Sequence, residues 1–186
     1  MERRQKYSKA IIFFFVLFLL WIVIQFLAPI SLPKNSVNDL SGMVGVSDND
    51  ETISKMSFPW NSVYSIGDRL CHQKAERSFF INGNEMPFCS RCTAIWLGLA
   101  IGLGLMVFYK MQLNEKFLFV IIFGVVPLAI DGVGQLLGFW ESANIIRLIT
   151  GLLAGVVCGV AIGVIIDEIN DAHLLKNIKI FHKNKT

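Results

Sequence analysis

Four long blocks of apolar residues constrain the fold of this chain more than any other feature. They cover residues 10–30, 93–109, 117–137 and 148–166. About 20 apolar residues cross a bilayer as a helix, and hydrocarbon offers the backbone no hydrogen-bond partner outside itself. Only 17% of the residues are charged, against about 25% in an average soluble domain. The sequence therefore predicts an all-α integral membrane protein with four transmembrane helices.

The first block could alternatively be a cleaved signal peptide, because Arg3, Arg4, Lys6 and Lys9 precede it. It is longer than the apolar region of a signal peptide, and no A-x-A-like cleavage site follows it. We therefore expect an uncleaved membrane anchor.

Basic residues beside the blocks predict the orientation of the chain. Four precede the first block, two lie in the link 110–116, and four lie in the tail after Asp167. Positive flanks favour the cytoplasm, so we expect both termini inside a cell membrane and the cysteine-rich segment outside. Because this topology explains the basic charge, nucleic-acid binding is not supported.

The chain divides into five parts along its length. We expect an N-terminal stub with the first helix (1–30), a flexible outer linker (31–57), an outer Cys/His segment (58–92), a core of three transmembrane helices (93–166) and a cytoplasmic tail (167–186). The linker is rich in Ser, Asn, Asp and Gly, which predicts a segment without a core of its own.

The Cys/His segment is expected to contain a short helix and a hairpin. Pro59 suits a helix start, and Val63, Ile66 and Leu70 then form an apolar stripe that could lie on the membrane surface. Asn82-Gly83 predicts a tight turn in a hairpin at 78–88. Such a hairpin would bring the later cysteines back towards the first.

Cys71, His72, Cys89 and Cys92 form the candidate chemical site, for which three interpretations remain open. One is a structural disulfide between Cys71 and one of the later two cysteines. Another is a metal site, because a Cys₃His set commonly binds zinc. The third is thiol–disulfide catalysis by Cys89, Cys92 and Cys71. In that case Cys89, at a helix start and near Arg91, is expected to have the lower thiol pKa.

Polar residues at membrane depth form a second candidate cluster. Asp131 and Gln135 are one helical turn apart, and Arg147 opens the last block. Ionised groups in lipid pair with one another or line a cavity, so we expect an Asp131–Arg147 pair completed by Asn144 and Thr150. This pair would either fix two helices or form a polar pocket beneath the Cys site.

Three arginines could form a cationic rim at the outer interface. Arg77, Arg91 and Arg147 are candidates to bind the phosphate or carboxylate of an anionic lipid or small solute.

Glycines repeat at intervals of four residues in two blocks. Small residues at this spacing let membrane helices approach closely, within one chain or between the chains of a homo-oligomer. The positions are Gly98 and Gly102 in the second block and Gly151, Gly155, Gly159 and Gly163 in the fourth. Cys158 lies among the second set and is expected to be a small apolar packing residue.

Two strings carry a resemblance to a known family, CHQKAERSFFINGNEMPFCSRC from Cys71 and DGVGQLLGFWESANIIRLITGLLAG from Asp131. Together they resemble the small membrane proteins of domain of unknown function 2085, over about residues 68–163. The resemblance implies a membrane protein and carries over no activity. It points to Cys71, His72, Gln73, Arg77, Cys89, Arg91, Cys92, Asp131, Gln135 and Arg147.

The C-x-x-C at the outer boundary is also similar to that of the vitamin K epoxide reductase type of enzyme. Those proteins are four-helix bundles linked to quinone, but their helix order and cysteine placement differ, so the likeness is an analogy of site. The leading hypothesis is an outer Cys/His site for metal binding or thiol redox chemistry. The alternative is a non-catalytic membrane or carrier protein with a structural disulfide.

Overall fold

The computed structural model describes the backbone of residues 2–3 and 8–183 and the side chains of residues 8–172. Within these residues, four helices are long and apolar enough to cross a membrane. They are α1 (Lys9–Ser31), α4 (Ser90–Phe108), α5 (Glu115–Leu136) and the N-terminal part of α6 (Asn144–Lys183). The prediction of an all-α membrane protein with four spans is confirmed.

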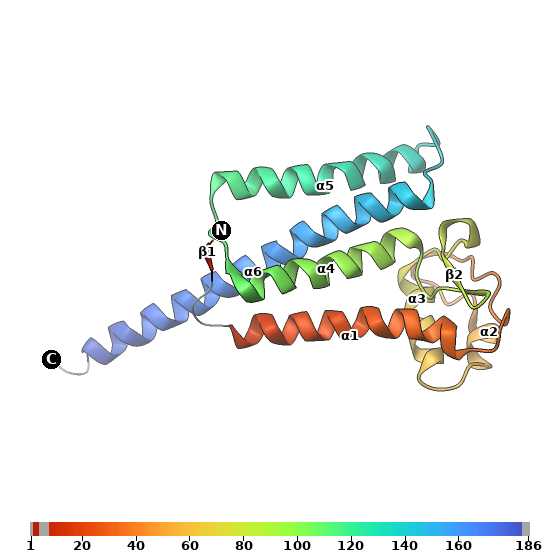
Figure 1. Ribbon diagram of the computed structural model, residues 1–186, viewed down its shortest axis with the longest axis horizontal. Helices are drawn as coiled ribbons and strands as arrows, with labels where there is room; N and C mark the ends of the chain where they lie inside the picture. The colour runs from red at the N-terminus through yellow and green to blue at the C-terminus, as the bar shows by residue number, and fades with distance from the viewer. Residues whose placement is uncertain (1, 4–7, 184–186) are drawn as a thin grey trace.

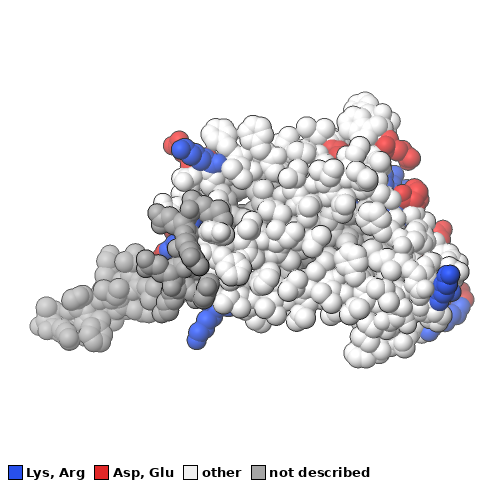
Figure 2. All heavy atoms as spheres, in the orientation of Figure 1, with Lys and Arg blue, Asp and Glu red and all other residues white. Residues whose placement is uncertain are grey.

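The four long helices lie side by side in the order α1, α4, α6, α5 (Figure 1). Helices that follow one another along the chain run in opposite directions, so the neighbours α4 and α6 run parallel. The start of α1, the link between α4 and α5 and the C-terminal part of α6 lie at one end of this bundle. Elements α2 (Asp50–Ser54), α3 (Trp60–Leu70) and β2 (Phe80–Ile81) lie at the other. Among the described residues on the face in Figure 2, charged side chains gather at the two ends and leave an uncharged band between them. Large apolar side chains such as Phe123, 74% exposed, cover the outside of the helices, as lipid contact requires.

Helices α4 and α6 form the most closely packed pair of the bundle. A Cβ atom built on Gly98 would lie 2.5 Å from the carbonyl oxygen of Leu152, and one on Gly159 would lie 2.5 Å from that of Leu99. These distances are far inside van der Waals contact, so the two backbones touch where the glycines face each other. The four-residue repeat therefore serves close helix packing within one chain.

The segment between α1 and α4 folds into a small insertion at one end of the bundle. Its elements are α2 (Asp50–Ser54), α3 (Trp60–Leu70), the 3₁₀ turn η1 (Ala75–Arg77), β2 (Phe80–Ile81) and β3 (Asn84–Glu85). Near the opposite end, β1 (Glu2–Arg3) pairs antiparallel with β4 (Tyr109–Lys110).

Strands β2 and β3 form the expected hairpin. They pair antiparallel, with Phe80 opposite Glu85 and Ile81 opposite Asn84. The two turn residues have positive φ angles, 56° at Asn82 and 72° at Gly83. This is the type I′ geometry that the Asn-Gly pair predicts.

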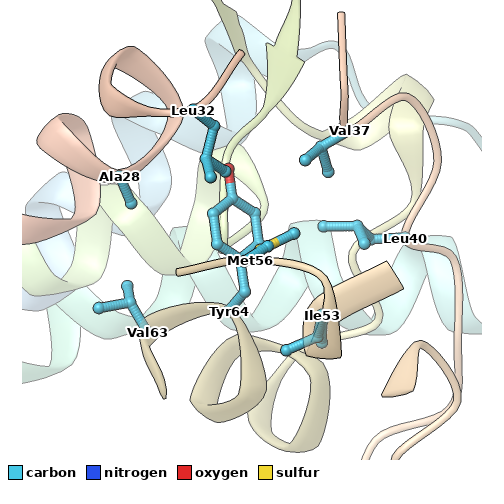
Figure 3. Close-up of a cluster of buried hydrophobic side chains, with 8 residues drawn as sticks. All are labelled: Ala28, Leu32, Val37, Leu40, Ile53, Met56, Val63 and Tyr64. Atoms are coloured by element: carbon cyan, nitrogen blue, oxygen red, sulfur yellow. The ribbon is translucent and has the colours of Figure 1, made fainter. Parts of the chain in front are cut away.

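The expectation of an outer linker without a core is wrong. Residues of that segment join the end of α1 and helix α3 in one buried apolar cluster, with the ring of Tyr64 at its centre (Figure 3). Its members are Ala28, Leu32, Val37, Leu40, Ile53, Met56, Val63 and Tyr64. The apolar residues of the linker follow neither a helical nor a strand period, which is why periodicity missed them.

The apolar stripe expected on α3 is divided between two environments. Val63 is buried in the cluster of the insertion, whereas Ile66 and Leu70 are 40% and 57% exposed. Only the exposed pair remains available to a membrane surface.

Candidate functional site

A cavity of about 150 Å³ lies where the insertion meets the starts of α4 and α6. Sequence segments that are far apart contribute to it, including the CHQ string, the C-x-x-C motif, α5 and α6. Its lining residues are Val44, Leu70, Cys71, His72, Gln73, Lys74, Arg77, Cys89, Arg91, Cys92, Gln135 and Arg147.

Three cysteines form the centre of this site. Cys71 is the C-cap of α3, Cys89 is the N-cap of α4, and Cys92 lies in the first turn of α4. Their Sγ atoms lie within 4.8 Å of one another. All three are free thiols, as is Cys158. The hairpin therefore brings the cysteines together as expected.

The backbone around Cys71 turns sharply to make this approach. Gln73 has a φ of 39°, and its Nε2 donates to the carbonyl oxygen of Pro87 at 2.6 Å. A Cβ atom on Gly67 would overlap that same carbonyl oxygen. A glycine in α3 is thus what lets the segment before Cys89 lie against the end of the helix.

Hydrogen bonds between the sulfurs shift the thiol pKa values of Cys89 and Cys71 in opposite directions. Interactions with Cys71 and then Cys92 lower the pKa of Cys89, and the backbone N–H groups of Cys92 and Arg91 act in the same direction. The pKa of Cys71 is raised, first by the hydrogen bond it shares with the Cys89 sulfur. The backbone N–H of Cys89 also donates to Cys71 Sγ at 3.4 Å. Cys89 therefore has the depressed thiol pKa, as the sequence predicted, although its sulfur neighbours contribute more than the helix start.

His72 does not complete a Cys₃His set in this geometry. Among the residues with described side chains, the group of candidate metal ligands at this site consists of the three sulfurs. His72 is exposed and lines the same cavity. It follows a residue at the end of α3, so its side chain and that of Cys71 leave the backbone in different directions.

The expected Asp131–Arg147 pair is replaced by another ion pair. The carboxylate of Asp131, on α5, pairs with Arg91 Nη2 at the start of α4. Arg147 Nη1 instead donates to Asn144 Oδ1 at 2.9 Å, within the first turn of α6. Thr150 donates to the carbonyl oxygen of Ile146 in its own helix, at 2.9 Å. The carboxylate of Asp131 is therefore paired with Arg91, in the first turn of α4, while Arg147 and Thr150 make the hydrogen bonds given above within α6.

The three predicted arginines all line the cavity, although they are far apart in sequence. Arg77 lies 3.7 Å from Glu141 and 3.8 Å from Glu76, and both of these carboxylates are largely exposed. Within the described side chains, the Nε atoms of all three arginines and the Nε2 of Gln135 are buried without an acceptor. Unused donors therefore surround the cavity.

Sequence reasoning missed three lining residues, Lys74, Val44 and Leu70, the last of which was expected on the apolar stripe of α3. Lys74 directly follows the CHQ string, and this position is a signal that could have identified it. Val44 belongs to the segment expected to be a flexible linker, and its sequence carries no comparable signal.

The apolar helices and the thiol cluster at their end define a class, a multi-pass α-helical membrane protein with a cysteine site beside the bilayer. The chain belongs to the family described as predicted membrane protein (DUF2085), whose model matches residues 71–161. This range contains all the lining residues of the cavity except Val44 and Leu70.

Two archaeal relatives have similar sequences. The uncharacterized protein MJ1492 of Methanocaldococcus jannaschii is 36% identical over 107 residues, which cover 55% of this chain and 67% of the relative. An uncharacterized protein of Methanothermobacter thermautotrophicus is 37% identical over 83 residues, covering 45% of this chain and 75% of the relative. No solved structure matches.

Proposed function

We propose that Cys71, Cys89 and Cys92 bind a zinc ion at the membrane boundary. The observation that carries this proposal is the convergence of three sulfurs within 4.8 Å of one another. Zn–S bonds of about 2.3 Å in tetrahedral geometry place sulfurs about 3.8 Å apart, so side-chain shifts alone could close the site. Soft thiolate ligands also favour zinc over hard cations.

The electrostatics of the cavity support thiolate ligation. A zinc ion with three thiolates carries a net charge of −1, and Arg77, Arg91 and Arg147 line the same space. The lowered pKa of Cys89 favours its metal-binding form. Three protein ligands leave a fourth position open to the cavity, which water, His72 or another ligand could occupy.

Metal analysis of the purified protein tests this proposal. We expect about one zinc per chain in the wild type and a large loss in Cys71→Ser and Cys89→Ser, because a missing thiolate opens the site. Cys158→Ser is the matched control, since Cys158 lies on α6 outside the cluster. Zinc absent from the wild type after supplementation, or equal in all four proteins, would reject the site.

Thiol–disulfide exchange is a second candidate, favoured by the contrast between the lowered pKa of Cys89 and the raised pKa of Cys71. Cys89 and Cys92 would lose two electrons and two protons to form a disulfide, and a membrane quinone would accept both to become quinol. Thiol trapping in cells separates the candidates. Thiols that change state with quinone supply favour exchange, whereas a permanent disulfide favours the non-catalytic alternative.

A further inference from the structure

We infer that the cavity beside the cysteine cluster binds a phosphate-class oxyanion, held by Arg77, Arg91 and Arg147 with Gln135. This inference concerns the same cavity as the proposed zinc site, but it does not require the metal. It rests on a buried charge and on hydrogen-bond donors that have no partner among the described side chains, and on the placement of two helix starts.

The buried charge belongs to Arg147. This residue is only 4% exposed, and the nearby carboxylate of Asp131 already pairs with Arg91. The hydrogen-bond acceptor of Arg147 among the described residues is the neutral amide of Asn144. A buried cation without a counter-charge is strongly unfavourable, so an anion in the cavity would offset its cost.

Unused hydrogen-bond capacity points the same way. In the part of the chain with described side chains, the Nε atoms of the three arginines and the Nε2 of Gln135 are buried without a hydrogen-bond acceptor, and all four side chains line the cavity. The Oε1 of Glu76, 3.8 Å from Arg77 Nε, is too distant for a hydrogen bond. Buried donors usually have partners, so four orphaned donors around one cavity indicate a missing acceptor. A guanidinium presents several N–H groups in a fork that fits the oxygens of phosphate.

The helices add to the positive potential of this space. Cys89 and Asn144 mark the starts of α4 and α6, and both starts lie at the cavity end of the bundle (Figure 1). Helix N-termini carry partial positive charge and disfavour cations in the first turn. Arg91 and Arg147 nevertheless occupy the first turns of these two helices, an arrangement that an anion between them would stabilise.

Size and charge favour phosphate over a single carboxylate. A space of about 150 Å³ could hold roughly five waters at ~30 Å³ each, enough for an ion with four oxygens. Of the three arginines, Arg91 alone has a buried carboxylate partner among the described residues, and the carboxylates near Arg77 are 60% and 82% exposed. The remaining positive charge matches a phosphate monoester or diester, supplied either by free phosphate or by a lipid head group.

Calorimetric titration of zinc-free, purified protein with inorganic phosphate tests the inference. We expect saturable binding by the wild type and at least tenfold weaker binding by Arg147→Gln, because a charge-assisted hydrogen bond is lost. Arg77→Gln, in a more exposed position, should weaken binding in the same direction and serves if Arg147→Gln does not fold. Arg69→Gln is the matched control, because Arg69 is exposed, bonds Ser47 and does not line the cavity.

A second arm identifies the source of the phosphate. The same proteins are placed in nanodiscs of phosphatidylcholine with or without phosphatidic acid, and lipid retention is measured by mass spectrometry. Arginine-dependent enrichment of phosphatidic acid assigns the site to a head group, and arginine-dependent binding of phosphate alone assigns it to the free ion. No binding in either arm, or equal losses in Arg69→Gln and Arg147→Gln, would overturn the inference.

The two proposals fail separately in these experiments. Phosphate binding that depends on Arg147 in a protein that takes up no zinc would remove the metal site and leave the anion site. Zinc binding without phosphate or lipid binding would do the reverse.

Discussion

Glu85 is a carboxyl group with no exposed surface, held inside the insertion. Its Oε2 accepts from the backbone N–H of Leu40 at 3.0 Å, and its Oε1 is buried without a hydrogen-bond partner among the described residues. Burial raises the pKa of Glu85 to about 7, although the nearby Ser78 side chain and the hydrogen bond from the Leu40 backbone oppose the shift. The folded insertion therefore binds a proton here more tightly than the unfolded chain does.

This difference predicts a pH-dependent stability of the insertion. Between about pH 4.5 and pH 7 the folded state holds the proton that the unfolded state has released, so stability falls as pH rises through this window. Glu85→Gln is neutral at every pH and keeps an acceptor for Leu40. It should remove the dependence of the insertion's stability on pH in this window and stabilise the insertion by about 3 kcal/mol above pH 7.

Hydrogen–deuterium exchange of a peptide covering residues 36–41, corrected for intrinsic rates, measures this effect. Glu51→Gln is the control. Glu51 is an exposed carboxylate on α2, so its replacement should leave the slope of stability against pH unchanged. Identical pH profiles for wild type and Glu85→Gln would contradict the assignment.

At the scale of elements, the contact between α4 and α6 depends on the absence of side chains. A Cβ atom on Gly98 would lie 2.5 Å from the carbonyl oxygen of Leu152 and 2.7 Å from the N atom of Val156. Both are backbone atoms of α6, so relief requires the helices to separate. Because Arg91 and Arg147 lie in the first turns of these two helices and line the cavity, separation of the helices would also widen the cavity.

Gly98→Ala should therefore destabilise the bundle by about 1–3 kcal/mol, the usual cost of overpacking. On the same helix, the three atoms nearest to a Cβ atom at Gly104 would be ring carbons of Phe15, the first of them at 3.0 Å. That ring can move, so Gly104→Ala is the control and should cost less. Unfolding by SDS titration in mixed micelles, followed by circular dichroism, compares the two variants, and equal costs would count against backbone contact as the cause.

The hairpin illustrates which elements the sequence could predict. Asn-Gly between short apolar runs identified its turn, because that pair is suited to positive φ angles. The role of Asn84 was not visible. Its Oδ1 accepts from the backbone of Ser36 and Val37, and its Nδ2 donates to the carbonyl oxygen of Pro29 at 2.9 Å. One amide thus joins the hairpin to the end of α1 and to the supposed linker, through contacts that no local pattern encodes.

At the scale of the whole molecule, the bilayer accounts for what the sequence predicted well. A helix must be long and apolar to cross it, so block length located four helices closely. The cysteines of the candidate site could be predicted because thiols are chemically distinctive and because these three lie close together along the chain. The partner of Asp131 could not be predicted, because choosing Arg91 over Arg147 depends on how α4, α5 and α6 are placed around the cavity.

Because the helices form one bundle, the side of the membrane on which one end lies also determines the side of the other end. The insertion and the cavity lie at one end, and the link between α4 and α5 lies at the other (Figure 1). Four spans with basic residues at the link end predict that this end faces the cytoplasm. The thiol cluster would then lie outside the cytoplasm. Oxidising conditions there would determine the redox state of the thiols, and the metal available there would determine what they can bind.

Labelling with a membrane-impermeant maleimide tests this orientation. Ser54→Cys and Gln112→Cys each add an exposed thiol, the first in α2 of the insertion and the second in the link. In intact cells the reagent should label Ser54→Cys above the wild-type background and leave Gln112→Cys unlabelled until the membrane is permeabilised. Because both variants carry the same native cysteines, the background cancels. The opposite pattern would place the cavity in the cytoplasm, where its thiols would be kept reduced and its anion would come from the cell interior.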